Sequence, residues 1–232
     1  VPTGNFGNIL AAYYAKAMGV PVNKLICASN SNNVLTDFIN TGVYDRNRDF
    51  YTTISPSMDI LISSNLERML YIFADGDSKY IADIQNELAA KGRFVVNEDI
   101  KTKMQQHFYG GYCDDKATTQ TINDIFKDYG YLLDTHTAVA VNVYKQYLKE
   151  TDDKRPVVIA STASPYKFAQ NVLPAISDEV CEDEFQTVRT LSNVTSTEIP
   201  APIAALETAN IRFKDIYDKN DMYEAVRKCL GI

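Results

Sequence analysis

The sequence predicts an α/β protein in which helices cover both faces of a parallel sheet. Strand-like and helix-like segments alternate along the chain, and the strand candidates are short continuous apolar runs rather than alternating ones. Polar or glycine-containing loops follow these runs, at the strand ends where ligands bind in parallel sheets. A locally connected helical stretch over about residues 75–108 is predicted as an insertion on this sheet.

The first part of the chain alternates between helices and strands, each bounded by a turn residue. The apolar run 24–29 ends in a polar cluster, and the helix after it stops at Gly42, a typical C-terminal glycine. The β-branched and aromatic run 50–54 indicates a second strand before Pro56. The predicted elements are a helix over 9–18, a strand over 24–29, a helix over 34–40, a strand over 50–54 and a helix over 59–74.

The second part continues the alternation after the helical insertion. Its most apolar run is 156–160, which predicts a buried strand, and Pro165 suits the first turn of the helix that follows. Two amphipathic helices are expected over 78–107, a strand end at 110–113, and helices over 118–129 and 135–148, the last capped by Asp134. The segment over about 182–232 is expected to be helical or irregular, interrupted by Pro200 and Pro202.

Composition limits the possible functions. The chain has 232 residues, of which 45% are hydrophobic and 23% charged, so it can form a sizeable core as one domain or a large piece of one. A net charge of −7 without a basic stripe argues against nucleic acid. No apolar run approaches the ~20 residues of a membrane span, and no leader opens the chain. Four dispersed cysteines exclude a familiar zinc pattern and indicate reduced thiols in a cytoplasmic protein.

The loop Gly4-Asn5-Phe6-Gly7-Asn8 is the most informative motif. It runs directly into a helical stretch, so its backbone N–H groups and the positive end of the helix dipole are predicted to form a cup for a phosphate group. By itself this pattern also fits an ordinary turn with Asn8 as the N-cap. Such a cup normally follows a strand, which would lie before Val1, so we expect the chain to be a fragment.

Four segments in one order and spacing resemble threonine synthase, a pyridoxal-phosphate enzyme of fold type II with a tryptophan synthase β-like fold. They are Pro2 to Asn8, Ser55 to Arg68, Asp134 to Ala140 and Ser161 to Phe168. The resemblance covers essentially all of residues 1–232, which look like the C-terminal part of that catalytic domain. It implies that pyridoxal 5′-phosphate is the cofactor and that the N-terminal half of the same protein is the missing partner.

The resemblance also assigns site residues. Gly4, Asn5, Phe6, Gly7 and Asn8 match the family's phosphate loop, and Thr162 matches a threonine whose hydroxyl faces the pyridine nitrogen of the cofactor. The alternative for Thr162 is a helix-capping hydroxyl. Ser164 stands where many members have a histidine, which puts in doubt any role argued from an imidazole there.

Three further side chains have two interpretations each. Lys167 is tempting as the Schiff-base lysine, but in the family that lysine lies upstream of the phosphate loop, and a solvated helix lysine is the preferred interpretation. His136 borders the cofactor pocket by resemblance, as a neutral hydrogen-bonding side chain, or it ties the helix start to a neighbouring loop. Arg68 would attract the substrate phosphate, or it pairs with Glu67 or Asp59 on a solvated face.

The function implied by the resemblance is conversion of O-phospho-L-homoserine and water to L-threonine and phosphate. Because no residue corresponds to the Schiff-base lysine, the chain alone is expected to be inactive and to contain no catalytic residue. The alternatives are another fold type II enzyme, such as a serine or threonine dehydratase, and a non-catalytic binding module on the same scaffold. Dehydratases typically carry a glycine-rich run in place of Gly4 to Asn8, so the loop disfavours them.

Overall fold

A computed structural model describes residues 1–232 and divides them into two compact units, Val1–Ile199 and Pro200–Ile232. In the first unit, the strands β1 (Leu25–Ser29) and β4 (Phe108–Tyr112) pair in parallel, from Leu25 opposite Phe108 to Ser29 opposite Tyr112. Pro2 forms an isolated parallel bridge to Ala28. The chain therefore runs alongside β1 immediately before the Gly4 to Asn8 loop, and it enters α1 (Gly7–Ala17) at the end of this small parallel sheet.

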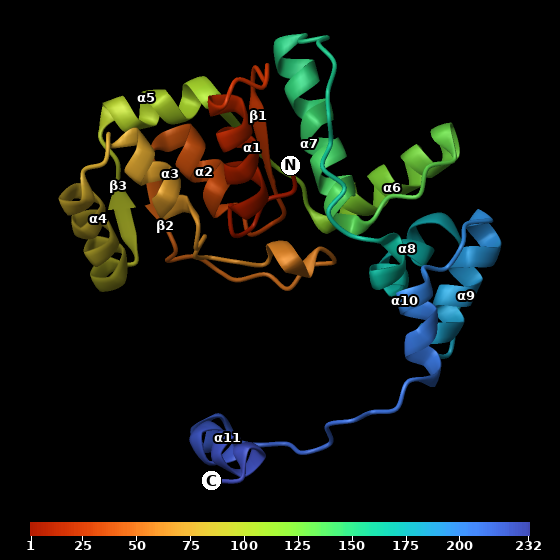
Figure 1. Cartoon of the computed structure of the whole chain (residues 1–232). Coiled ribbons are helices and arrows are strands. Elements are labelled where there is room, and N and C mark those ends of the chain that lie inside the picture. Colours follow the sequence, from red (N-terminus) through yellow and green to blue (C-terminus); the bar gives the residue numbers. More distant parts are fainter. The chain divides into compact units, whose positions relative to one another are not determined.

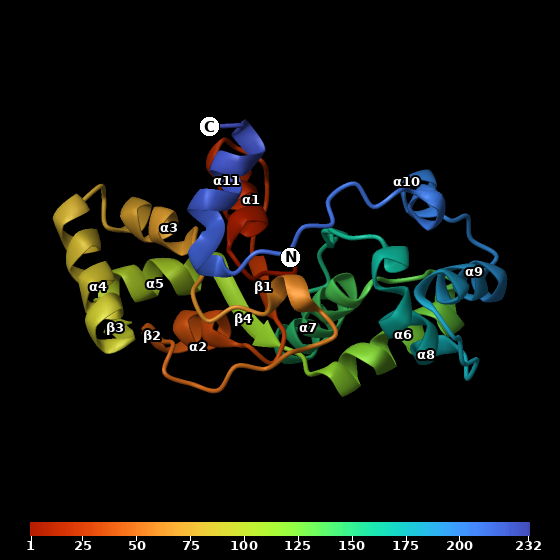
Figure 2. The same cartoon turned by 90° about the horizontal axis from the view of Figure 1, so that it is seen from below.

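Helices pack on both faces of β4, and two adjacent glycines make this possible. A Cβ on Gly110 would lie 3.2 Å from the Cα of Thr36 in α2 (Val34–Thr41). A Cβ on Gly111 would lie 2.7 Å from a methyl carbon of Val143 in α7 (Thr135–Thr151). Successive strand residues face opposite sides, so these glycines admit α2 on one face and α7 on the other (Figure 2). The predicted parallel sheet covered by helices is thus confirmed, as a two-stranded sheet.

The predicted helical insertion is present, and a segment of it pairs with an earlier segment in a short ribbon that was not predicted. The strands β2 (Val43–Asp45) and β3 (Arg93–Val95) pair antiparallel, and the ring of Tyr44 stacks on that of Phe94 at 5.2 Å between centroids. The labels in Figure 1 locate these elements. The insertion and its surroundings comprise α3 (Leu66–Phe73), α4 (Ser78–Lys91) and α5 (Glu98–His107).

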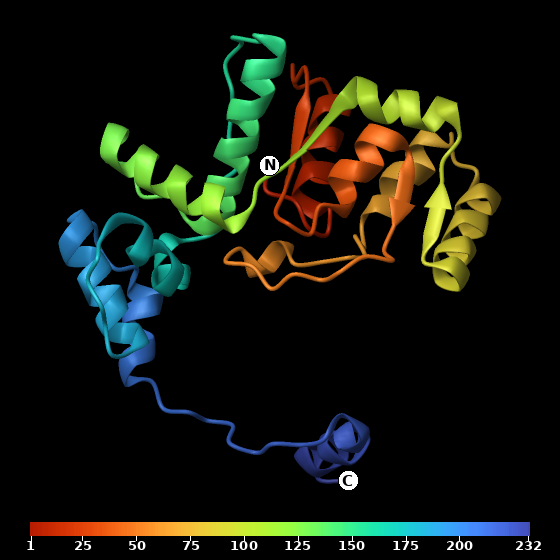
Figure 3. The same ribbon diagram turned by 180° about the vertical axis from the view of Figure 1, so that it is seen from behind.

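The second half of the first unit is helical. Asp114 and Asp134 cap the starts of α6 (Asp115–Tyr129) and α7, as the sequence predicted for α7, and Gly130 ends α6 in a left-handed conformation. Pro165 opens a 3₁₀ turn, η2 (Pro165–Phe168), which continues into α8 (Ala169–Ile176) and then α9 (Glu184–Thr195). Figure 3 shows α6 and α7 diverging from the end of β4.

Two predicted strands are absent, and one predicted helix is shorter than expected. Residues 50–54 form no strand, because their backbone groups bond to side chains: Tyr51 N–H donates to Asn32, and Thr53 N–H to Asp59. The predicted helix over 59–74 exists only as α3, preceded by the 3₁₀ turn η1 (Pro56–Met58). Residues 156–160 are extended without a ladder partner, and Val158 is 92% exposed. An apolar run forms a strand only where a neighbouring strand accepts its hydrogen bonds.

The second unit contains the short helix α10 (Ala201–Ala204), two 3₁₀ turns, η3 (Ala205–Thr208) and η4 (Lys219–Asp221), and α11 (Met222–Leu230). Pro200 is the N-cap of α10, in line with the predicted interruption. The unit has little core of its own, since Ala225 is its single buried residue. No helix in either unit is both long and apolar enough to cross a bilayer.

Candidate functional site

The Gly4 to Asn8 loop is held in place by its carbonyl groups. The Ser63 hydroxyl donates to the Gly4 carbonyl at 2.9 Å. The Asn5 carbonyl accepts two hydrogen bonds from Asn65, one from the backbone N–H at 3.1 Å and one from the side-chain amide at 2.7 Å. The Ser63-Ser64-Asn65 segment therefore binds one side of the loop, and the loop's amide hydrogens are left for another acceptor.

The backbone N–H groups of the loop make no hydrogen bond within the chain. This holds for the six consecutive residues from Gly4 to Ile9, whereas Thr3 N–H before them bonds to Ala28 and Leu10 N–H after them to Phe6. No side chain caps α1, so the alternative of Asn8 as an N-cap is wrong, and the N-cap position is Phe6. Free amides at the N-terminus of an 11-residue helix suit an anion.

Close packing fixes the loop's path. Phe6 adopts a left-handed conformation with φ 62°, which is unfavourable for a bulky residue, and its ring is buried against Phe108 at 5.5 Å between centroids. A Cβ on Gly4 would lie 3.0 Å from the Ser57 carbonyl oxygen and 3.1 Å from the Met58 Cα. Gly4 is required for this approach, whereas Gly7 has room for a side chain, with its nearest neighbour at 3.7 Å.

A cleft of about 330 Å³ opens beside the loop, within the size range of ligand cavities. Segments far apart in the sequence line it, and they include most of the residues predicted for the site. The lining residues are Pro2 to Asn8, Ser57, Met58, His136, Thr162, Ala163 and Lys167. Lys167 is the one lysine, arginine, aspartate or glutamate among them.

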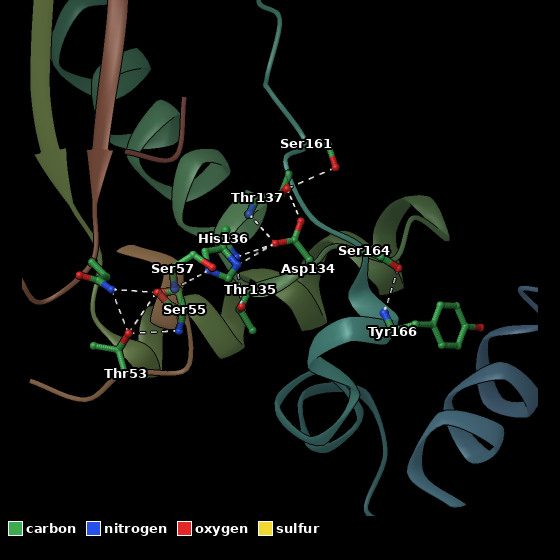
Figure 4. A network of polar contacts seen from close by, with 11 residues as sticks. Thr53, Ser55, Ser57, Asp134, Thr135, His136, Thr137, Ser161, Ser164 and Tyr166 are labelled. Atoms are coloured by element: carbon green, nitrogen blue, oxygen red, sulfur yellow. Dashed lines mark hydrogen bonds and ion pairs between the residues drawn. The ribbon is translucent and has the colours of Figure 1, made fainter. Parts of the chain in front are cut away.

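His136 is fixed by a buried network at the start of α7, drawn in Figure 4. The Ser57 backbone N–H donates to His136 Nε2 at 3.2 Å, and Nδ1 lies 3.1 Å from the Asp134 carboxylate. Because Nε2 accepts, the imidazole is neutral and its proton sits on Nδ1. His136 therefore ties the start of α7 to the 55–58 turn through Ser57, and it also lines the cleft.

Asp134 holds this network together. Its carboxylate accepts hydrogen bonds from the backbone N–H groups of His136 and Thr137, from the His136 ring and from the Thr137 hydroxyl. Burial raises the pKa of Asp134, but the bonds from the His136 and Thr137 side chains and backbones outweigh it, so the pKa is lowered overall. The Ser161 hydroxyl lies 3.3 Å from that of Thr137, which links the network to the Thr162 segment.

Thr162 and Ser164 have separate roles. Ser164 is the N-cap of η2, and its hydroxyl accepts from Tyr166 N–H at 3.3 Å, so the alternative of Thr162 as a capping residue is wrong. Thr162 lines the cleft, exposed, and no hydrogen bond within the chain involves its side chain. Its hydroxyl is available to a ligand.

Arg68 does not line the cleft. It lies exposed on α3, 4.0 Å from Glu67, and donates to the Asn65 side chain at 3.0 Å. Because Asn65 holds the Asn5 carbonyl, Arg68 is one residue removed from the loop. Asp59, the other partner considered for Arg68, instead accepts hydrogen bonds from Asn30, Asn32 and Thr53.

Several residues of the site were not singled out from the sequence. Ser63 and Asn65 hold the loop, Ser57 contacts both His136 and Gly4, and Asp134 orients His136. The motifs containing Ser63 and Asn65 were recognised and Asp134 was predicted as a cap, but only the hydrogen bonds reveal that Ser63 and Asn65 hold the loop and that Asp134 orients His136. Together the fold and the site define an α/β domain in which the N-terminus of a helix presents free backbone amides beside a ligand-sized cleft.

Comparisons with known proteins show which family this domain resembles. Residues 137–229 match the family model described as "Threonine synthase, C-terminal". Human threonine synthase-like 1 is 47% identical over 178 residues, which are 76% of this chain and 23% of that protein. The crystal structure of yeast threonine synthase matches 99% of this chain and 46% of its own, with a TM-score of 0.83 at 32% identity.

A structure of threonine synthase from Brucella melitensis, described as bound to pyridoxal phosphate, matches 85% of this chain and 40% of its own. Its TM-score is 0.72 at 34% identity. The chain is a relative of the threonine synthases with a partial fold type II domain, as the sequence predicted. It spans between about a quarter and a half of the length of these relatives.

Proposed function

We propose that this chain is the part of a threonine synthase that binds the phosphate and the ring nitrogen of pyridoxal 5′-phosphate. The reaction is conversion of O-phospho-L-homoserine and water to L-threonine and phosphate. The free N–H groups from Gly4 to Asn8 carry the proposal, because these residues line a ligand-sized cleft that the unpartnered Thr162 also lines. Neither a non-catalytic binding module nor a dehydratase has a specific observation in its favour.

The residues present fit this cofactor. Gly4, Asn5, Phe6, Gly7 and Asn8 would hold the phosphate with backbone N–H groups, which match its acceptor oxygens without a side-chain charge. The Thr162 hydroxyl would donate to an unprotonated pyridine nitrogen. When bound, pyridoxal phosphate supplies an electron sink for carbanion chemistry, and a hydroxyl partner moderates it compared with a carboxylate.

We propose further that additional polypeptide completes the site and supplies the Schiff-base lysine, so that residues 1–232 form the C-terminal part of one catalytic domain. The exposed apolar surface supports this. Val158 is 92% exposed in a segment without a ladder partner, and Phe213 and Ile216 are 85% and 97% exposed in the second unit. The segment 156–160 in particular leaves backbone groups unpaired, which a further strand could bind. All four cysteines are unpaired, which fits the reducing cytoplasm.

The test is an assay of phosphate release from O-phospho-L-homoserine with added pyridoxal phosphate. We expect no release by the 232-residue chain alone, and release when it is coexpressed with the N-terminal half of a threonine synthase. Release by the chain alone that Lys167→Ala abolishes would show that this chain contains its own Schiff-base lysine. Cofactor binding to the coexpressed pair without release would overturn the proposed reaction.

Thr162→Val in the active pair isolates the role of the hydroxyl, because valine keeps the shape and removes the donor. Loss of a hydrogen bond to a buried polar atom costs about 1–3 kcal/mol. We expect turnover to fall roughly tenfold to a hundredfold with a smaller change in cofactor affinity, since the phosphate loop binds independently. Unchanged turnover with cofactor bound would show that Thr162 has no part in the chemistry.

A further inference from the structure

Lys167 is the one cationic side chain of a cleft built around neutral donors. It lies in η2, it lines the cleft with the Gly4 to Asn8 loop, and no carboxylate pairs with it. Its ammonium group sits over the Phe168 ring at 5.3 Å, which positions the charge without neutralising it. The nearest acidic residue of the site network, Asp134, is buried and already accepts hydrogen bonds from His136 and Thr137.

Two other lysines of the first unit, Lys24 and Lys103, have structural roles. Lys24 donates to the last carbonyls of α5 at Gln105 and Gln106. Lys103 pairs with Asp75 and Asp99 and also caps α3 at the Phe73 carbonyl. Lys167 makes no such contact, and unlike the exposed Lys116 on α6 it lines the cleft.

The loop supplies hydrogen-bond donors to a phosphate ester but offsets only part of its charge. A helix N-terminus is equivalent to about half a positive charge, whereas a phosphate monoester carries about −1.5 to −2 at neutral pH. The free amides of the loop satisfy oxygen atoms but leave most of this charge unbalanced. Lys167 is the one group on the cleft lining that can balance it.

We propose that Lys167 binds the phosphate group of a phosphate monoester in this cleft, as a binding residue and not as the Schiff-base lysine. The inference rests on the proposed function and adds a charged ligand contact to it. Two sources share this chemistry, the cofactor phosphate and the substrate phosphate. The structure assigns the lysine to the cleft, and the arms of the experiment separate the two sources.

The experiment uses two ligand pairs that differ only in phosphate, titrated into the 232-residue chain. Pyridoxine 5′-phosphate against pyridoxine probes the cofactor source without a reactive aldehyde, and O-phospho-L-homoserine against L-homoserine probes the substrate source. Amide chemical shifts of Gly4 and Gly7, followed by two-dimensional NMR, report binding even when it is weak. Lys167→Met, Lys167→Gln and Lys167→Arg are compared with Lys116→Met, which removes the same charge from an exposed site on α6 outside the cleft.

We expect Lys167→Met and Lys167→Gln to weaken the phosphorylated member of one pair by roughly 5- to 30-fold, while the other member is unaffected. Lys167→Arg should retain most of the affinity, and Lys116→Met should equal the parent. The pair that responds identifies the source of the phosphate. Circular dichroism verifies that the variants are folded. Lys167 is exposed, and the use of two neutral substitutions keeps the test valid if one of the variants does not fold.

The other possible titration results would each contradict either the role of Lys167 or the proposed cofactor site. If the parent prefers the phosphorylated ligands and both neutral variants keep that preference, Lys167 does not bind phosphate and the proposed cofactor site stands. If both members of a pair weaken equally, Lys167 acts through packing and the inference is wrong. If the parent shows no preference for phosphate at all, the proposed cofactor site itself is wrong, and the role of Lys167 with it.

Discussion

The N-termini of α1 and α7 lie in the same unit and contribute to the same cleft, yet their amide groups have opposite fates. At α7, Asp134 accepts from two backbone N–H groups and two side chains. At α1, no side chain caps the helix, and six consecutive N–H groups have no acceptor in the chain. Where the chain's own side chains accept the first N–H groups of a helix, the helix start contributes to stability. Where these N–H groups have no acceptor and lie beside a cleft, they are available to a ligand.

The largest expected effect comes from removing the cap of α7. Asp134→Ala leaves buried donors from His136 and Thr137 unpaired, so we expect the free energy of unfolding to fall by about 2–4 kcal/mol. Chemical denaturation measures it. The matched variant is Asp183→Ala, which removes the exposed N-cap of α9 and should cost only about 1 kcal/mol. Equal losses in the two variants would show that the Asp134 network adds nothing to ordinary capping.

The two glycines of the α1 loop provide the next test. Gly4→Ala places a methyl group 3.0 Å from the Ser57 carbonyl, and we expect a loss of about 1–3 kcal/mol in stability together with weaker phosphate binding. Gly7→Ala has room and lies in the first turn of the helix, so stability should stay constant or rise by up to about 1 kcal/mol. Thermal unfolding and a phosphate titration measure both. A larger loss for Gly7→Ala would mean that the loop needs conformational freedom there rather than close packing at Gly4.

The same contrast explains which parts of the structure could be predicted from sequence. Local signals were sufficient for β1, for the caps at Asp134 and Gly42, and for the two helices of the insertion. The Gly4 to Asn8 loop was singled out by its motif, but its conformation was not predicted. The glycines do not adopt positive φ, and the residue that does is Phe6, held by packing that no local pattern shows.

Predictions failed where the outcome depends on distant partners. Residues 50–54 have a strand-like composition, but Asn32 and Asp59 satisfy their backbone. Residues 156–160 have the most strand-like pattern of all and find no neighbouring strand in this chain. The first half of the predicted helix over 59–74 is instead a loop, because Ser63 and Asn65 bond to Gly4 and Asn5.

Replacing His136 tests how the satisfied helix start supports the unsatisfied one. His136→Phe keeps a ring against Phe168 but removes the acceptor for Ser57 N–H, so we expect a loss of about 1–2 kcal/mol and faster amide hydrogen exchange at Ser57. His136→Gln retains an acceptor and should restore the protection of Ser57. The control is His107→Phe, which removes a buried nitrogen without a partner and should leave Ser57 unaffected. Unchanged exchange at Ser57 in His136→Phe would contradict the tie between the two segments.

The smallest effect is the pH dependence of the α7 cap. The pKa of Asp134 is lowered from its ordinary value of 3.8, so its contribution to stability is present above that value and is lost as the pH falls through the lower folded-state pKa. Denaturation midpoints between about pH 6 and pH 3 should therefore fall less steeply in Asp134→Asn, which keeps one acceptor oxygen and cannot ionise. Asp183→Asn, at the exposed cap, should follow the parent more closely. Parallel curves for the parent and Asp134→Asn would show that the buried carboxylate gains no stability from its charge.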